Sequence, residues 1–336
     1  MNAHDPVLTL ATDVAKTLLA APAEVEYVCG GGRNSRIYKV RCREQRFALK
    51  QYPSRAVDPR DRLGTEVSAL QLMQRYGIEV IPRVMAVDRQ RNFVLLSWID
   101  GALVDKVGDT DIDAAATFLS LVHALRYVPE AAKQPSAAEA CLSGREVERQ
   151  LRARRALLER LGAEEPDLGS FLAQAFAPAC AHYMAEAQAH MSAHGLDFVT
   201  ELAQEKRSLV PADFGFHNSL RRGDGSLAYV DFEYFGWDDP VKLTADILLH
   251  PGVPLGGAQQ RRFRDAAERL YGEDASFVVR LEALLPLFGL RWILILLNEF
   301  LPERWQRRVL AGTVESWSEA KARQLDKARN LLARLA

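Results

Sequence analysis

Two aspartates and an asparagine between positions 213 and 231 constrain this 336-residue chain more than any other feature. Asn218 follows Asp213 by five positions, which places a proton acceptor and a neutral oxygen ligand on one tight loop. Asp231 ends the next apolar run, Leu227–Val230, beyond a hydrophilic turn. Carboxylate and amide oxygens are hard donors that suit Mg²⁺, and a carboxylate can also accept the proton of a hydroxyl. The spacing therefore predicts a loop and hairpin with one proton acceptor, Asp213, and two metal ligands, Asn218 and Asp231.

A glycine cluster, a lysine and a glutamate stand upstream, in the order that a triphosphate site needs. The run Val28–Val40 reads as a strand, tight turn and strand whose backbone can approach phosphates closely. Lys50 ends a β-run, and Glu66 lies in a helical pattern from which it could hold the Lys50 ammonium against the phosphates. The candidate phosphate-binding residues of the turn are Gly31, Gly32, Asn34 and Ser35.

Each of these features also has an ordinary structural explanation. Asp213 and Asn218 could cap a turn, and Asp231 could simply end a strand. The glycines could form a hairpin turn, Lys50 could end a strand in solvent, and Glu66 could be an exposed helix charge. Their occurrence together, in this order, favours a single nucleotide-binding catalytic site.

With these motifs, the chain resembles the aminoglycoside phosphotransferase and choline kinase-like family, the small-molecule branch of the protein-kinase fold. The resemblance runs from Gly30 to at least Pro251. The segment Phe93–Gly101 resembles the family's hinge strand, and Phe118–Leu125 resembles a family helix in which His123 is usually structural. The resemblance implies that ATP and Mg²⁺ bind, and that adenine meets the backbone of Ser97, Trp98 and Ile99.

The chain departs from the family pattern at the catalytic loop. Pro211 and Gly215 occupy positions where the family usually or often has histidine, and His217 follows two residues later. The missing first histidine normally braces the loop, so the departure concerns loop geometry more than chemistry. Glu233 stands where protein kinases have the glycine of Asp-Phe-Gly, which is ordinary variation in the small-molecule branch.

The resemblance implies an α+β, bilobal protein-kinase-like fold. We expect a small N-terminal β-sheet lobe that binds ATP over residues 1–100 and a large, mostly helical C-terminal lobe over 101–336, which carries the catalytic loop and the substrate pocket. Hydrophobic periodicity predicts helices near 6–20 and 60–76, three β-runs over 24–52 and two strands over 83–98. The helical stretch 130–205 is expected to break at Pro166 and Pro178.

Charge and composition exclude several other classes of protein. The 43 basic and 44 acidic residues nearly cancel, so no basic field is expected for a nucleic acid. The four cysteines lack C-x-x-C spacing and no signal-like segment is recognisable, which predicts a cytoplasmic location. The apolar stretch Leu284–Leu301 is interrupted by Pro286, Arg291 and Glu299, so a buried helix is expected rather than a membrane span. No sequence feature indicates an oligomeric state.

These observations predict an ATP-dependent kinase that phosphorylates a hydroxyl of a small molecule. The residues that bind this acceptor molecule have no comparable motif. Arg291 and Asn298 fall near one face of an otherwise apolar helix, and such a pair suits a sugar or related metabolite at least as well as a polycation. A core helix with polar ends explains the same pattern. The candidate substrate residues are Glu233, Arg291, Asn298 and Glu299.

Other functions remain open at this point. An aminoglycoside or amino-alcohol kinase fits the same motifs. A nucleotide-binding regulatory module with weak or no turnover would keep the glycine turn and Lys50, and the altered catalytic loop supports that alternative. A kinase acting on proteins is disfavoured, because Asp231–Pro240 is too short for a peptide-binding activation segment.

Overall fold

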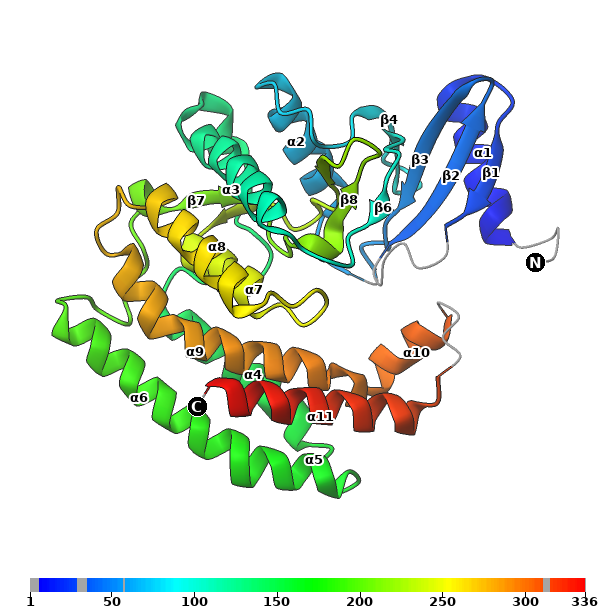
Figure 1. Cartoon of the computed structure of the whole chain (residues 1–336). Coiled ribbons are helices and arrows are strands. Elements are labelled where there is room, and N and C mark those ends of the chain that lie inside the picture. The colour runs from blue at the N-terminus through cyan, green and yellow to red at the C-terminus, as the bar shows by residue number, and fades with distance from the viewer. Residues whose placement is uncertain (1–5, 29–34, 57, 311–314, 336) are drawn as a thin grey trace. The chain divides into compact units, whose positions relative to one another are not determined.

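The computed structural model describes residues 6–28, 35–56, 58–310 and 315–335 (Figure 1). The chain forms two compact units, each made of two stretches. Unit 1 comprises Met1–Ala138 and Leu209–Trp237, and unit 2 comprises Glu139–Ser208 and Asp238–Ala336. The predicted α+β class is confirmed, because unit 1 carries the sheets and unit 2 is built mainly of helices. The predicted lobe boundary after residue 100 stays a prediction.

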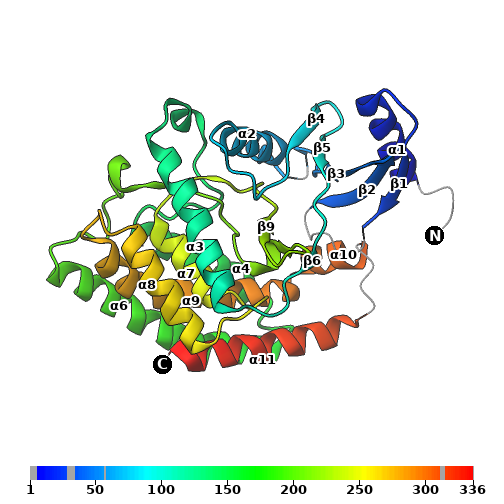
Figure 2. The ribbon, with the colours of Figure 1, turned by 45° about the horizontal axis from the view of Figure 1, so that its top comes forward.

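Unit 1 is built around an antiparallel five-stranded sheet with the order β1-β2-β3-β5-β4. Alternation along the strands buries one face, with Tyr38, Val40, Phe47 and Leu49, against helix α1 (Pro6–Leu19; Figure 2). Lys50 has the opposite parity and therefore lies on the other face. The strands are β1 (Glu24–Tyr27), β2 (Arg36–Cys42), β3 (Gln45–Gln51), β4 (Val84–Asp88) and β5 (Phe93–Ser97).

Two helices and a second sheet complete unit 1. Helix α2 (Arg62–Arg75) begins where the Asp61 side chain accepts a hydrogen bond from the Gly64 N–H, and helix α3 is Asp109–Ala124. Strand β8 (Ser219–Arg221) pairs antiparallel with β9 (Leu227–Tyr229), which confirms the predicted hairpin, and with β6 (Ala102–Leu103). Strands β7 (Ser208–Val210) and β10 (Gly236–Asp238) also flank this segment of the chain.

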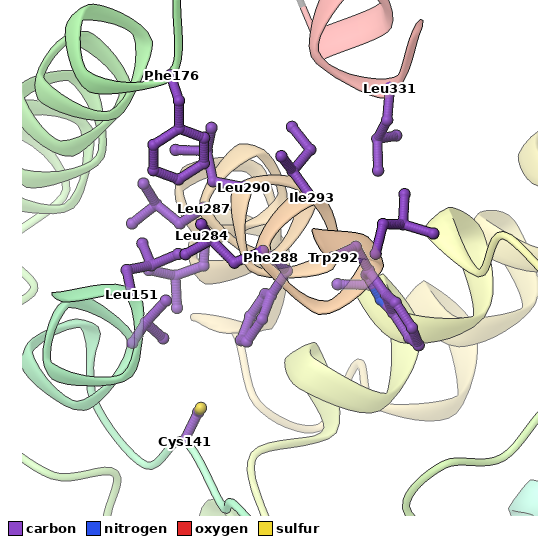
Figure 3. Packing of buried hydrophobic residues seen from close by; sticks show 14 of the residues in the cluster. Cys141, Leu151, Phe176, Leu284, Leu287, Phe288, Leu290, Trp292, Ile293 and Leu331 are labelled. Atoms are coloured by element: carbon purple, nitrogen blue, oxygen red, sulfur yellow. The ribbon is translucent and has the colours of Figure 1, made fainter. Parts of the chain in front are cut away.

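Unit 2 packs around α9 (Phe277–Leu296). Figure 3 shows its Leu284 and Phe288 near Leu151 of α4 and its Ile293 near Leu331 of α11, and all five side chains are buried. By length and composition, the segment Phe277–Phe300 could span a membrane, but 67% of its most apolar window is buried in the structure. The other helices of unit 2 are α4 (Gly144–Glu159), α5 (Pro166–Phe171), α6 (Ala177–Ala193), α7 (Pro240–Leu249), α8 (Gly257–Leu270), α10 (Pro302–Leu310) and α11 (Trp317–Leu335).

The predicted break at Pro178 is wrong. A π-helical turn over Leu172–Phe176 joins α5 to α6 without interruption. In that turn the Ala177 N–H donates to the Leu172 carbonyl, five residues back. The wider turn accommodates a proline that lacks an N–H and whose ring would clash with a normal α-helical carbonyl. The helix therefore continues through Pro178, whereas Pro166 does begin a new helix as expected.

Asp274 lies at the start of α9 and is expected to make the stability of unit 2 depend on pH. Its carboxylate accepts hydrogen bonds from Ser276 Oγ and Arg280 Nη1, both at 2.6 Å. Burial alone would raise the pKa of Asp274, but these donors lower it from 3.8 to about 2. The carboxylate therefore stabilises the fold above pH 4, and this contribution is lost as the pH falls through about 2.

We expect Asp274→Asn to lower the free energy of unfolding by about 1–2 kcal/mol at pH 7. The difference between the variant and the wild type should shrink as the pH falls from 4 toward 3, because Asp274 of the unfolded wild-type chain, with a pKa near 3.8, begins to protonate while the folded carboxylate stays charged. Urea unfolding of both proteins across this range measures the effect. A difference that stays constant with pH would show that the carboxylate charge is not the source.

Candidate functional site

Lys50 of β3 and Glu66 of α2 form a buried ion pair in unit 1. The Lys50 Nζ lies 2.6 Å from Glu66 Oε2, and the two side chains are 4% and 1% exposed. The hydroxyl of Tyr52 also donates to Glu66 Oε2 at 2.6 Å. The pair predicted from the helical and strand patterns is therefore present in the structure.

Asp231 joins this pair from the end of the β8–β9 hairpin. Its Oδ1 lies 2.7 Å from Lys50 Nζ. Burial would lower the pKa of Lys50, but the neighbouring carboxylates of Asp231 and Glu66 outweigh it and raise the pKa well above its ordinary value. The neighbouring carboxylates therefore favour the charged form of Lys50 in this buried position.

The loop before β8 and the end of the β8–β9 hairpin have an unusual backbone at the two predicted acids. Asp213 and Asp231 have φ angles of 53° and 71°, and Ala212 has a φ of 32°. Non-glycine residues rarely adopt this left-handed region, and residues held there are concentrated at functional sites. Aspartate tolerates it better than most residues do. The sequence thus places a tolerant residue where the fold imposes strain.

Hydrogen bonds close the loop and bring its asparagine to the same end of the hairpin as Asp231. Asn218 Nδ2 donates to the Asp213 carbonyl at 3.0 Å, and the Val230 N–H donates to the Asn218 carbonyl at 3.0 Å. Ser219 Oγ donates to the Gly215 carbonyl at 3.1 Å. These contacts brace a loop that lacks the usual histidine at Pro211.

His217 does not replace that histidine through a direct hydrogen bond to Asp213, the predicted proton acceptor. Its Nε2 lies 3.7 Å from Asp213 Oδ1, which is too far for a hydrogen bond. The Asp213 carboxylate retains 41% exposure. It is therefore accessible to a hydroxyl group.

Phe118 of α3 supports both acidic segments from behind. Its ring centroid lies 5.4 Å from that of Phe214, 4.4 Å from that of Tyr229 and 6.1 Å from that of Phe232. Phe214 follows Asp213 and Phe232 follows Asp231 in the chain, so the neighbours of both acids pack on one ring. This aromatic packing fixes the loop and the hairpin against α3.

The hinge residues are held by the strands around them. Ser97 exchanges hydrogen bonds with Arg83, because its N–H donates to the Arg83 carbonyl and its Oγ accepts from the Arg83 N–H, both at 2.8 Å. Trp98 Nε1 donates to Asp100 at 3.1 Å. Ser97, Trp98 and Ile99 line a cavity of about 460 Å³. Their proposed contact with adenine stays a prediction.

The glycine turn is mostly outside the structure's described part. Gly31, Gly32 and Asn34 fall within 29–34 and so lie outside the described residues. Ser35 is described and is buried just before β2. The proposed phosphate contacts of all four residues stay predictions.

Glu233 lies inside unit 1 beside the Lys50 cluster. Its Oε2 is 3.4 Å from Lys50 Nζ, and its Oε1 accepts a hydrogen bond from Arg62 Nη1. Only 3% of the residue is exposed. Burial, the largest influence, and the charges of Asp231 and Glu66 raise the pKa of Glu233 to about 7, although Lys50 and Arg62 act in the opposite direction.

The other candidate substrate residues lie in unit 2. Arg291 donates to Glu139 Oε2 at 2.6 Å, to Gln150 Oε1 at 3.1 Å and to Asp246 Oδ1 at 3.4 Å. Asn298 and Glu299 follow α9 in the short helix Leu297–Phe300, where Glu299 is buried and Asn298 is half-buried. The structure therefore gives Arg291 internal partners, and a substrate role for these residues stays a prediction.

Sequence reasoning did not identify Tyr52 and Arg62 as members of the site. The sequence nevertheless contains a pattern that could have located each of them. Tyr52 lies two residues after Lys50 in line with the alternation of β3, which directs both side chains to the same side. Arg62 lies one helical turn before Glu66 on the buried face of α2.

The oxygen donors at this site suit a hard divalent cation. One carboxylate oxygen from each of Glu66, Asp231 and Glu233 lies within 4.8 Å of the others. The Asn218 main chain accepts a hydrogen bond from the Val230 N–H, next to Asp231, and the role of its side-chain amide oxygen as a metal ligand stays a prediction. Oxygen-only donor sets of this kind fit Mg²⁺ better than zinc or copper.

Comparison with known proteins identifies the family and agrees with the fold. The sequence profile of the phosphotransferase enzyme family (APH) matches residues 28–274, and the chain belongs to that family. The family predicted from the sequence motifs is therefore confirmed. No curated protein sequence matches the chain.

Solved structures show the same fold at low sequence identity. Choline kinase LicA from Streptococcus pneumoniae superposes with a TM-score of 0.61 and 15% identity, covering 98% of this chain and 100% of that one. The gentamicin complex of APH(2")-IIa gives a TM-score of 0.58 and 16% identity, covering 99% and 97%. Spectinomycin phosphotransferase APH(9)-Ia, solved with ADP and spectinomycin, gives 0.59 and 10%, covering 97% and 98%. The predicted kinase-like bilobal fold is confirmed.

Proposed function

We propose that this protein transfers the γ-phosphate of Mg-ATP to a hydroxyl of a small molecule. The observation that carries the proposal is the buried contact of Lys50 with both Glu66 and Asp231, at 2.6 Å and 2.7 Å. A buried cation held between two carboxylates, beside a loop with an accessible aspartate, has the parts that phosphoryl transfer requires. Membership of the phosphotransferase enzyme family supports the same reaction class.

Each residue has a distinct role in this proposal. Lys50, oriented by Glu66, binds the phosphates of ATP. Asp213 orients the acceptor hydroxyl and takes its proton as the bond to phosphorus forms. Asp231 and Asn218 are the proposed Mg²⁺ ligands, and a bound Mg²⁺ would neutralise charge on the phosphate oxygens. The backbone of Ser97–Ile99 is proposed to contact the adenine.

The acceptor is proposed to be a small hydroxyl compound, with cationic amino alcohols and aminoglycosides as the first classes to test. The structures with similar folds include a choline kinase, a gentamicin complex and a spectinomycin phosphotransferase. The preference for a sugar rested on Arg291, and its guanidinium has acidic partners within unit 2. Sugars therefore become the second class to test.

A transfer screen tests the function directly. Purified protein is incubated with Mg-ATP and pooled amino alcohols, aminoglycosides or sugars, and phosphorylated products are detected by mass spectrometry. We expect one pool to yield a product that requires Mg²⁺. Mg-ATP binding without transfer to any pool or to water would instead favour the nucleotide-binding regulatory module, which the altered loop at Pro211 supports.

The ion pair of Lys50 and Glu66 makes a separate prediction. Lys50→Met should lower kcat/KM for ATP by about 10²- to 10³-fold, because a preorganised phosphate-binding charge is lost. Glu66→Gln should have a smaller effect, and the double variant should resemble Lys50→Met alone, because Glu66 acts through Lys50. Steady-state kinetics of the three variants measure the coupling. Independent, multiplicative losses would show that Glu66 does not act through Lys50.

A further inference from the structure

Two side chains of α2, one helical turn apart, hold the segment that follows β9. Glu66 Oε1 accepts a hydrogen bond from the Phe232 N–H at 3.3 Å. Arg62 donates to Glu233 and to the Tyr234 hydroxyl, the latter at 2.6 Å. Residues four apart share a helix face, so α2 contacts consecutive residues of this segment at two points. The segment begins at Asp231, the proposed metal ligand.

The guanidinium of Arg62 is buried and fully engaged. Arg62 is 5% exposed. Its Nε donates to Asp58 Oδ2 at 2.8 Å, and its Nη2 donates to the same oxygen. The planar group also lies 4.9 Å from the ring centroid of Tyr234. A rigid fork that reaches two carboxylates and a hydroxyl at once is a geometry that lysine cannot reproduce.

The charges around Lys50 explain why a second cation is needed. Lys50 Nζ has three carboxylate neighbours, Glu66 at 2.6 Å, Asp231 at 2.7 Å and Glu233 at 3.4 Å. Arg62 takes one oxygen of Glu233, so Lys50 is not the sole counter-charge of that buried group. Without Arg62, Glu233 would compete more strongly for Lys50 and draw its ammonium away from the phosphates.

We propose that Arg62 is a positioning residue for phosphoryl transfer. By holding Glu233 against α2, it keeps Asp231 in place and leaves Lys50 available to ATP. Arg62 acts through Glu233 rather than by touching the substrate. This inference rests on the proposed function, because it assigns Arg62 to the same nucleotide site.

The test compares Arg62→Met with a matched control, Arg60→Met. Arg60 also pairs with Asp58, at 2.8 Å, but makes no ion pair with Glu233 among the described residues. Asp58 keeps Arg60 as a partner when Arg62 is replaced. Isothermal titration with Mg-ATP gives the affinity, and slow hydrolysis of Mg-ATP with water as the acceptor gives turnover. We expect Arg62→Met to weaken Mg-ATP binding by about 10- to 100-fold and Arg60→Met to leave it unchanged.

A double-mutant cycle tests whether Arg62 affects Mg-ATP affinity through Glu233. If Arg62 acts through Glu233, then Arg62→Met should cause little further loss of Mg-ATP affinity in a Glu233→Gln background. Arg62→Lys keeps the charge but loses the fork, so it should restore only part of the affinity. Arg62→Lys also provides the test if Arg62→Met does not fold, with an expected loss of about 10-fold.

Two outcomes overturn the positioning role. One is a lower melting temperature of the Arg62 variants with unchanged Mg-ATP affinity and turnover, which is the result of a purely structural role. The other is an equal loss from Arg62→Met with and without Glu233→Gln. A failed function is distinguishable, because wild-type protein that neither binds nor hydrolyses Mg-ATP refutes the proposed function itself, whatever the variants do.

Discussion

Replacing Asp213 with asparagine is expected to slow phosphoryl transfer by about 10²- to 10⁴-fold while leaving Mg-ATP affinity unchanged. The carboxylate is proposed to take the proton of the acceptor hydroxyl, and an amide cannot do so. ATP binding is assigned to other groups, Lys50 and Asp231 among them. The measurements are initial rates with the acceptor found in the transfer screen, and calorimetric titration with Mg-ATP.

Asp213→Asn separates an effect on phosphoryl transfer from an effect on folding. Asparagine tolerates the left-handed backbone of position 213, where φ is 53°, about as well as aspartate does. The contact from Asn218 goes to the main-chain carbonyl of Asp213, so it is retained. Asp197→Asn is a matched control, because Asp197 is an exposed carboxylate of unit 2 that accepts hydrogen bonds from the Val199 N–H and the Thr200 hydroxyl. Near wild-type turnover in Asp213→Asn at saturating acceptor would remove Asp213 from the mechanism.

The parts of the site that the sequence predicted are those encoded by local periodicity. The hairpin of β8 and β9 follows from two short apolar runs around a polar turn, and it sets Asn218 and Asp231 at one end. The pairing of Lys50 with Glu66 required only that a strand end face a helix, and the two residues are 16 positions apart. Patterns of period two and 3.6 contain this information.

The parts that the sequence did not predict depend on contacts between distant segments. Arg62 and Glu233 are 171 positions apart, and no local pattern specifies that they meet. Periodicity could place Arg62 on the buried face of α2, where an arginine needs a partner, but it could not name Glu233 as that partner. The same is true of Arg291, whose partner Glu139 is 152 positions away.

Pro178 illustrates a different limit. Proline is a strong helix-breaking signal, and the expectation of a break followed from it. The structure instead inserts a π-helical turn at Leu172–Phe176, and the buried Leu172 and Phe176 pack in the core of unit 2. Tertiary packing thus outweighs the local cost of the proline. The sequence alone does not show the strength of this packing, so it could not predict the outcome.

Replacing Arg291 with methionine is expected to lower the free energy of unfolding of unit 2 by about 3 kcal/mol. Only 5% of Arg291 is exposed, and its guanidinium lies between Glu139 and Asp246. Breaking a buried pair costs about 3–5 kcal/mol when one charge is left alone. The lower end applies here, because Glu139 retains Arg154 at 2.6 Å and Asp246 retains Lys242 at 3.3 Å.

The experiment separates this structural role from a role in acceptor binding. Arg155→Met is the control, because Arg155 on α4 makes an exposed pair with Glu159 and should change stability by less than about 0.5 kcal/mol. Urea unfolding measures both variants, and kinetics with the acceptor found in the screen measure its KM. If internal pairing is the role of Arg291, the acceptor KM of the folded variant stays unchanged. A raised acceptor KM with undiminished stability would return Arg291 to the substrate pocket and restore a sugar as the favoured acceptor, because an arginine that its neighbours do not need is free to bind anionic or polyol groups.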